Sequence, residues 1–173
     1  MRREPERPMT PEEACAREAI RHTLASYHRA GDRGRLDDLV ATFTDDGVLE
    51  LASGRHEGRT AIRAALSGVG RRDAGDPCRP VFLHHHLTTT YLALTGPSTA
   101  EGSCSFLVMS PIGVDHCGRY ADEYAEVDGR WLIARRRVTI AWASPDSIVG
   151  ATATGRHGQK SEPPSTFTQA PVT

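Results

Sequence analysis

Helical and strand-forming patterns occupy separate parts of this chain, and this separation constrains the fold more than any other feature of the sequence. Residues 10–13, Thr-Pro-Glu-Glu, combine a capping threonine, a proline suited to the first helical position and a glutamate that can close a capping box. Apolar residues at helical spacing follow, and this helix should end near Gly31. Two shorter helices are predicted over Arg35–Phe43 and Thr60–Leu66.

The strand patterns come almost entirely after the helical ones. Runs of β-branched, aromatic and aliphatic residues predict strands over residues 48–51, 82–94, 99–109, 116–127 and 130–142, with turns at 44–47 and 54–58. Residues 128–129, Asp-Gly, are a strong signal for a two-residue turn and join the last two strands in a hairpin. Segregated elements of this kind predict an α+β fold, with N-terminal helices packed on a bent antiparallel sheet.

The length of 173 residues suffices for one domain with a real core and leaves no room for two. We place that domain at residues 10–143. Residues 1–9 are charged and carry two prolines, which predicts a mobile arm. Residues 144–173 are rich in Gly, Ser, Thr and Pro, which predicts a tail that is disordered or loosely packed. Residues 68–80 form a long polar loop that is suited to a flexible flap over a pocket.

The predicted strand Phe82–Leu94 holds the leading candidate for a catalytic side chain. Alternation places Leu83, His85, Leu87, Thr89, Tyr91 and Ala93 on one face of it, and His84, His86, Thr88 and Thr90 on the other. His85 is then a single imidazole on the more apolar face. Because histidine ordinarily titrates near working pH, at about 6.5, we interpret His85 as a candidate acid/base residue. The alternative is a core histidine that is hydrogen-bonded to a neighbour.

Composition and charge argue against several classes of partner. A net charge of −1 and a pI near 6.7 give no reason to expect binding to nucleic acid or to an anionic membrane. The longest apolar runs are too short to span a bilayer, and the N-terminus lacks the apolar segment of a secretory signal. The four scattered cysteines suit free thiols in a reducing cytoplasm, so we expect a cytoplasmic protein.

Two clusters of basic residues have more than one interpretation. Adjacent strand residues point to opposite faces, so only His84 and His86 could share a metal ion, which is too few ligands for zinc. We therefore expect no metal site. Residues 135–137 are three arginines that split between the faces of their strand. They either pair with Glu123 or Glu126 across the hairpin or reach an anionic substrate.

Four stretches of the sequence together resemble one family. They are Tyr27–Asp32 (YHRAGD), Phe43–Val48 (FTDDGV), Gly58–Ile62 (GRTAI), and Gly118–Tyr124 (GRYADEY) running into Val127–Trp131 (VDGRW). In this order and spacing they resemble the SnoaL-like branch of the NTF2-like superfamily, over roughly residues 11–142. The resemblance implies a cone-shaped α+β barrel and a homodimer that forms through the outer face of the sheet.

The resemblance also implies a catalytic pair. Scytalone dehydratase and the dehydrochlorinase of hexachlorocyclohexane use a histidine on the central strand as base and an aspartate after the first helix to orient it. By position these roles fall on His85 and Asp32. Departures from the pattern are Gly31, where the dehydratase has a tyrosine, and Thr89, where the branch commonly has an asparagine. The residues expected to contact substrate are Tyr27, Tyr91, His116 and Tyr120.

Taken together, the residues and the resemblance favour a cofactor-independent enzyme. His85 and Asp32 would provide acid/base catalysis on a small apolar or polyketide-like molecule, by elimination, isomerisation or ring closure. The alternative is a non-catalytic ligand-binding or accessory protein of the same fold. Addition of water to an epoxide is a third possibility, although that chemistry in the superfamily usually needs a richer Asp–Arg–Asp set.

Overall fold

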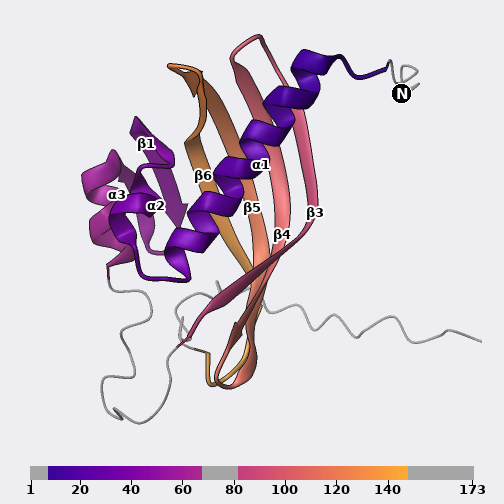
Figure 1. Cartoon of the computed structure of the whole chain (residues 1–173). Helices are drawn as coiled ribbons and strands as arrows, with labels where there is room; N and C mark the ends of the chain where they lie inside the picture. The colour runs from indigo at the N-terminus through magenta and orange to yellow at the C-terminus, as the bar shows by residue number, and fades with distance from the viewer. Residues whose placement is uncertain (1–7, 68–81, 148–173) are drawn as a thin grey trace, which may run out of the picture.

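The structure is a computed structural model that describes residues 8–67 and 82–147 (Figure 1). Within these residues the helices are α1 (Pro11–Gly31), α2 (Leu36–Val40) and α3 (Arg59–Leu66). The strands are β1 (Phe43–Leu51), β2 (Gly54–Glu57), β3 (His84–Leu94), β4 (Thr99–Ser110), β5 (Gly113–Val127) and β6 (Arg130–Ala143). The α+β class predicted from the sequence is confirmed, with the helices preceding the long strands.

The strands form one curved sheet in the order β2-β1-β6-β5-β4-β3 (Figure 1). Every neighbouring pair is antiparallel except β1 and β6, which run parallel with Leu49 opposite Arg136. The prediction of a wholly antiparallel sheet is wrong for this pairing, and the sheet is mixed. Alternation of side chains indicates which face of a strand is buried but not its direction, so the sequence pattern does not distinguish the two arrangements.

Element boundaries around β1 differ from the prediction. Residues 44–47, predicted as a turn, lie within β1, where the register against β6 shifts between Phe43 and Val48. Residues 54–58, also predicted as a turn, contain β2. Gly47 lies so close to Phe43 that an added Cβ would stand 3.0 Å from the Phe43 side chain, which explains a glycine inside this strand. The second helix is shorter than predicted and ends at Val40.

Helix α1 lies across one face of the sheet, which we call the inner face, and α2 and α3 lie beside β1 (Figure 1). Thr10 caps α1 by accepting a hydrogen bond from the Glu13 N–H at 3.3 Å, and the Glu13 side chain accepts one from the Thr10 N–H at 2.9 Å. The buried side of α1 and the inner face share one apolar core. Its members include Ile20, Leu24, Leu39, Phe43, Leu49, Ile62, Leu92 and Ile133.

A fully buried ion pair lies between α1 and the inner face. Arg136 of β6 is 0% exposed and donates to Asp122 of β5 from Nε at 2.9 Å and from Nη2 at 2.7 Å. Its guanidinium lies 4.3 Å from the ring centroids of both Tyr27 and Tyr120. The Tyr124 hydroxyl also donates to Asp122, at 2.7 Å. Burial opposes the charge of Arg136, but the attraction of Asp122 outweighs it and holds the pKa of Arg136 well above its usual value.

His28, in the last turn of α1, belongs to the same buried layer. It is 6% exposed, and its ring centroid lies 5.0 Å from that of Tyr27 and 5.4 Å from that of Tyr120. Burial, and after it repulsion from Arg136, lower the pKa of His28 to about 2. The imidazole is therefore neutral at physiological pH.

A β-bulge in β3 changes which residues face the core. The register against β4 shifts between Thr88 and Tyr91, and Thr89 has a φ of 45°, which β-branched residues rarely adopt. Beyond the bulge Leu92 is 3% exposed, whereas Tyr91 is 67% exposed. The prediction that Tyr91 shares the inner face with His85 is therefore wrong, because the extra residue reverses the phase of alternation.

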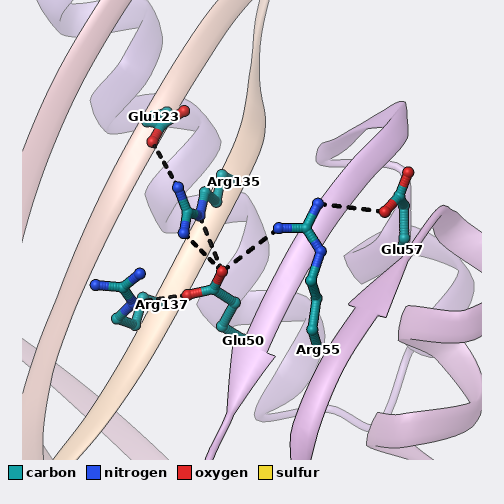
Figure 2. Close-up of polar contacts among 6 residues, drawn as sticks. All are labelled: Glu50, Arg55, Glu57, Glu123, Arg135 and Arg137. Atoms are coloured by element: carbon teal, nitrogen blue, oxygen red, sulfur yellow. Dashed lines mark hydrogen bonds and ion pairs between the residues drawn. The ribbon is translucent and has the colours of Figure 1, made fainter.

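The outer face of the sheet carries a network of ion pairs centred on Glu50 (Figure 2). Glu50 accepts hydrogen bonds from Arg135 at 2.7 Å and from Arg137 at 2.6 Å, and the Arg55 guanidinium lies 3.6 Å away. The predicted pairing across the hairpin is confirmed for Arg135, which lies 3.3 Å from Glu123. The homodimer predicted through this face stays a prediction, because the structure contains one chain.

Residues 144–147, predicted as the start of the tail, are hydrogen-bonded to β5. The Ser144 N–H donates to the Asp115 carbonyl at 2.7 Å, and the Ser147 hydroxyl donates to the Asp115 carboxylate at 2.5 Å. The remainder of the predicted tail, the predicted flap at residues 68–80 and most of the predicted N-terminal arm lie outside the described residues. None of the described helices is both long and apolar enough to cross a membrane.

Asp122→Asn should destabilise the fold strongly, because the Arg136 charge would remain buried beside a neutral amide. Breaking a buried pair from one side costs about 3–5 kcal/mol. Asp37→Asn is the matched control: it removes an exposed partner that lies 2.7 Å from Arg63, and it should cost no more than about 1 kcal/mol. Urea unfolding of both variants checks this, and equal losses of unfolding free energy would contradict it.

Thr89→Gly should leave stability unchanged or raise it by up to about 1 kcal/mol, because glycine adopts the positive φ of this bulge without strain. Thr88→Gly, one residue earlier in regular strand, should instead destabilise by roughly 0.5–1 kcal/mol. Thermal unfolding of the two variants measures the difference. A larger loss at residue 89 than at residue 88 would show that the backbone there is not strained.

Because His28 is buried in its neutral form, the free energy of unfolding should decrease at acid pH. The unfolded chain binds a proton at this residue below about pH 6.5, whereas the folded chain does so only near pH 2, so stability is lost as the pH falls. Between about pH 7.5 and about pH 5 this loss amounts to roughly 2 kcal/mol. His28→Phe should remove that part of the pH dependence, and His22→Phe, on the exposed side of α1, should keep it. Urea unfolding at both pH values tests this, and identical losses in wild type and His28→Phe would refute it.

Candidate functional site

Asp32 and His85, the two residues predicted as an acid/base pair, are hydrogen-bonded to each other. The His85 Nδ1 lies 2.7 Å from Asp32 Oδ1, and the His85 backbone N–H lies 3.3 Å from both carboxylate oxygens. Each side chain is 21% exposed. Because Asp32 accepts the hydrogen on Nδ1, the Nε2 of a neutral His85 carries the lone pair and can take up a proton.

The local fold brings these two side chains together. Asp32 caps the C-terminus of α1, and its N–H donates to the His28 carbonyl at 2.8 Å. Nearer the other end of α1, the Arg17 guanidinium donates to the Leu92 carbonyl of β3, which holds the helix along that strand. His85 lies before the bulge in β3, so the alternation predicted from the sequence holds at this position.

A cavity of about 410 Å³ lies beside the pair, between the helices and the start of β3. Its apolar lining consists of Leu36, Leu39, Leu66 and Leu83. Its polar lining consists of Tyr27, His28, Arg63, Ser67 and His85, which places Tyr27 where a substrate contact was expected. An apolar cavity with a few convergent polar groups is typical of small-molecule sites.

A second cavity, of about 490 Å³, also borders the pair. A larger share of its lining residues has polar side chains than in the first cavity. The lining consists of Ala25, His28, Arg29, Asp32, Arg33, His84, His85 and Leu87. His28 and His85 line both of these cavities. The two histidines therefore form the wall between them.

His116 forms a second, more deeply buried pair with Asp115. The His116 Nδ1 lies 2.7 Å from Asp115 Oδ1, and the two side chains are 7% and 0% exposed. Asp115 also accepts a hydrogen bond from the Ser110 hydroxyl at 2.9 Å. Burial lowers the pKa of His116, and the hydrogen bond to Asp115 opposes this only in part. A neutral His116 that donates from Nδ1 has an acceptor, not a donor, at Nε2.

Tyr120 lies behind the pair on the inner face. Its ring stacks on Phe106 with centroids 4.4 Å apart, and burial raises its pKa well above the usual value, so the hydroxyl keeps its proton. His28 lies between it and the pair, with ring centroids 5.1 Å from His85 and 5.4 Å from Tyr120. Neither Tyr120 nor His116 is among the described residues that line the two cavities.

The structure removes one predicted contact and adds two buried residues that the sequence analysis missed. Tyr91 points away from the pair because of the bulge in β3. The sequence did contain a signal for His28, since it precedes Asp32 by four residues and so lies on the same face of the helix. The sequence contained no such signal for Asp115, because this residue is the extra residue of a bulge in β5 opposite β4. Only that bulge allows Asp115 and His116, which are neighbours in the chain, both to be buried.

The arrangement is suited to proton transfer. A histidine oriented by a carboxylate, beside an apolar cavity, can take a proton from one substrate atom and return it to another. In residues 8–67 and 82–147, no group of three or more His, Cys, Asp or Glu side chains is arranged to hold a metal ion.

Solved structures with the same fold come from several bacteria. A putative scytalone dehydratase from Novosphingobium aromaticivorans is 22% identical, with a TM-score of 0.68 over 79% of this chain and 91% of that one. A protein of unknown function from Mycobacterium tuberculosis is 24% identical, with a TM-score of 0.67 over 83% of each chain. The protein LinA is 17% identical, with a TM-score of 0.64 over 78% and 91% of the two chains. At these identities the likeness shows the fold alone.

Comparison with curated protein sequences gave no match. The family model of the SnoaL-like domain matches residues 12–137, a span that runs from the first turn of α1 into β6. That span includes Asp32, His85, His116 and Tyr120, so the expected site lies within the matched region. Because the match covers well over half of the sequence, the chain belongs to the SnoaL-like domain family.

Proposed function

We propose that this protein is a cofactor-independent enzyme that uses His85 and Asp32 for acid/base catalysis on a small, largely apolar or polyketide-like molecule. The observation that carries this proposal is the 2.7 Å hydrogen bond between His85 Nδ1 and Asp32 at the wall of a leucine-lined cavity. A histidine that only fills the core would need no neighbouring cavity of about 410 Å³. A structural neighbour that bears the name scytalone dehydratase is consistent with a reaction of the elimination type.

In the proposed reaction, the Nε2 atom of His85 removes a proton from a carbon next to a carbonyl or a leaving group. Asp32 holds the hydrogen on Nδ1, which fixes the tautomer and stabilises the imidazolium as it forms. The electron pair left on carbon then moves toward the carbonyl or expels the leaving group. His85 returns the proton to the expelled group in an elimination, or to another atom of the substrate in an isomerisation or ring closure.

Tyr120 and His116, both expected to contact substrate, differ in what they could donate to a substrate oxygen, although neither lines the two described cavities. Burial raises the pKa of Tyr120, so its hydroxyl remains a donor. The Nδ1 hydrogen of His116 is already bonded to Asp115, which leaves only an acceptor on the neutral ring.

The alternative function is that of a non-catalytic ligand-binding or accessory protein with an inert pocket. It is favoured by Gly31, which offers no hydroxyl beside Asp32, and by Thr89, which lies in the bulge of β3. The two functions differ in one measurable respect. A binding protein would hold a ketone without labilising the hydrogens next to its carbonyl.

The wild-type protein should accelerate deuterium exchange at the carbon atoms next to the carbonyl of 2-indanone in heavy water. This probe is a small uncharged ketone with activated C–H bonds. His85→Ala should lower the catalysed exchange rate by roughly 10²–10⁴-fold, the usual contribution of a general base. Asp32→Asn should lower it nearly as far, because the amide favours the wrong histidine tautomer. Proton NMR follows the loss of the exchanging signal.

His86→Ala is the matched control, because His86 is exposed on the opposite face of β3 and should keep the wild-type rate. Circular dichroism establishes that each variant is folded. Exchange by the wild type no faster than in buffer would contradict catalysis and favour the binding protein. A full rate in His85→Ala would rule out the pair as the base, and His116 would be the next residue to test.

A further inference from the structure

His28 is a buried polar residue that the proposed mechanism leaves without a role. It is 6% exposed, and its ring centroid lies 5.1 Å from that of His85. Among the described residues, neither ring nitrogen of His28 has a hydrogen-bond partner. An imidazole with two unused hydrogen-bonding atoms therefore lies directly against the proposed base.

A purely structural role does not account for a histidine at this position. A buried polar atom without a partner loses its bonds to water and receives nothing in return. Phenylalanine would fill the same space between Tyr27 and Tyr120 without that loss. The environment also keeps the ring uncharged, because burial, Arg136 and His85 all lower the pKa of His28. The feature that phenylalanine would lack is the neutral hydrogen-bonding capacity of the imidazole.

The position of His28 makes that capacity available to a ligand. His28 and His85 are the two residues that line both cavities beside the pair. The terminal torsion of histidine has a broad, roughly two-fold energy profile, so a modest rotation turns one nitrogen toward a bound molecule. A neutral imidazole then offers one donor and one acceptor, without a charge that would hold an anion.

We propose that His28 is a substrate-binding residue whose neutral imidazole hydrogen-bonds a carbonyl or hydroxyl oxygen of a ligand placed against His85. This inference rests on the proposed function and narrows its substrate class to uncharged molecules that carry such an oxygen. An oxygen held by His28 would bring the neighbouring carbon close to the His85 ring, whose centroid lies 5.1 Å from that of His28. The two histidines then have different tasks: His28 positions the substrate and His85 moves the proton.

The test compares two probes that differ in one group, 2-indanone and 2-methylideneindane, in which a CH₂ group replaces the carbonyl oxygen. NMR titration gives both dissociation constants for each variant, and their ratio cancels effects of shape. In His28→Phe the ratio should shift roughly 3- to 10-fold toward the hydrocarbon, the usual contribution of one hydrogen bond. His28→Gln keeps an amide donor and should shift the ratio less. His22→Phe, the same change on the exposed side of α1, should not shift it.

A second readout does not depend on substitution. In wild-type protein with ¹⁵N-labelled histidine, 2-indanone should move a ring-nitrogen signal of His28, and 2-methylideneindane should not. An unchanged probe ratio in His28→Phe overturns the inference. So does a wild-type protein that does not bind 2-indanone.

The outcomes separate this inference from the proposed function, because binding and exchange are measured independently. A shifted ratio without catalysed exchange supports His28 as a ligand contact and contradicts the role of His85 as base. Exchange that depends on His85, together with an unchanged ratio, supports the enzyme and contradicts the role of His28.

Discussion

The arrangement of the inner face depends on the buried pair between Arg136 and Asp122. A guanidinium without access to water is stable there because Asp122 neutralises it and two aromatic faces cover it. One of these faces, Tyr27, comes from α1, and the other, Tyr120, comes from β5. The same stack that shields the charge therefore fixes the helix against the sheet. Through the helix it also sets the position of Asp32.

The charge of Arg136 gives the two histidines of the site different environments, although their rings lie only 5.1 Å apart. His28 is on the buried side, where Arg136 and the absence of water disfavour a proton. His85 is on the cavity side, partly exposed and hydrogen-bonded to the Asp32 carboxylate. Burial and charge thus keep the ring of His28 neutral, whereas a carboxylate orients the ring of His85, without any difference in residue type.

Local sequence patterns correctly predicted the parts of the structure that do not depend on irregular pairing between strands. His85 and Asp32 could be predicted because strand alternation and the end of a capped helix can be recognised from consecutive residues. Tyr91 was placed on the wrong face because the bulge at Thr89 carries no glycine or other signal. Asp115 was missed for the same reason, since its burial depends on an extra residue that only the paired strand reveals. The parallel pairing of β1 with β6 is likewise a property of the assembled sheet.

The place of β6 in the sheet has a consequence for the order in which the protein can assemble. It is the last of the described strands along the chain, yet it lies in the interior of the sheet between β1 and β5. During synthesis, the β1–β2 hairpin and the β3–β5 meander leave the ribosome before the strand that joins them, so each has an unpaired edge. Arg136, the partner of Asp122, belongs to β6 and is therefore also synthesised after the other strands. Joining of the two halves is thus a step that follows translation of Ala143, and until then both halves are potential clients for chaperones.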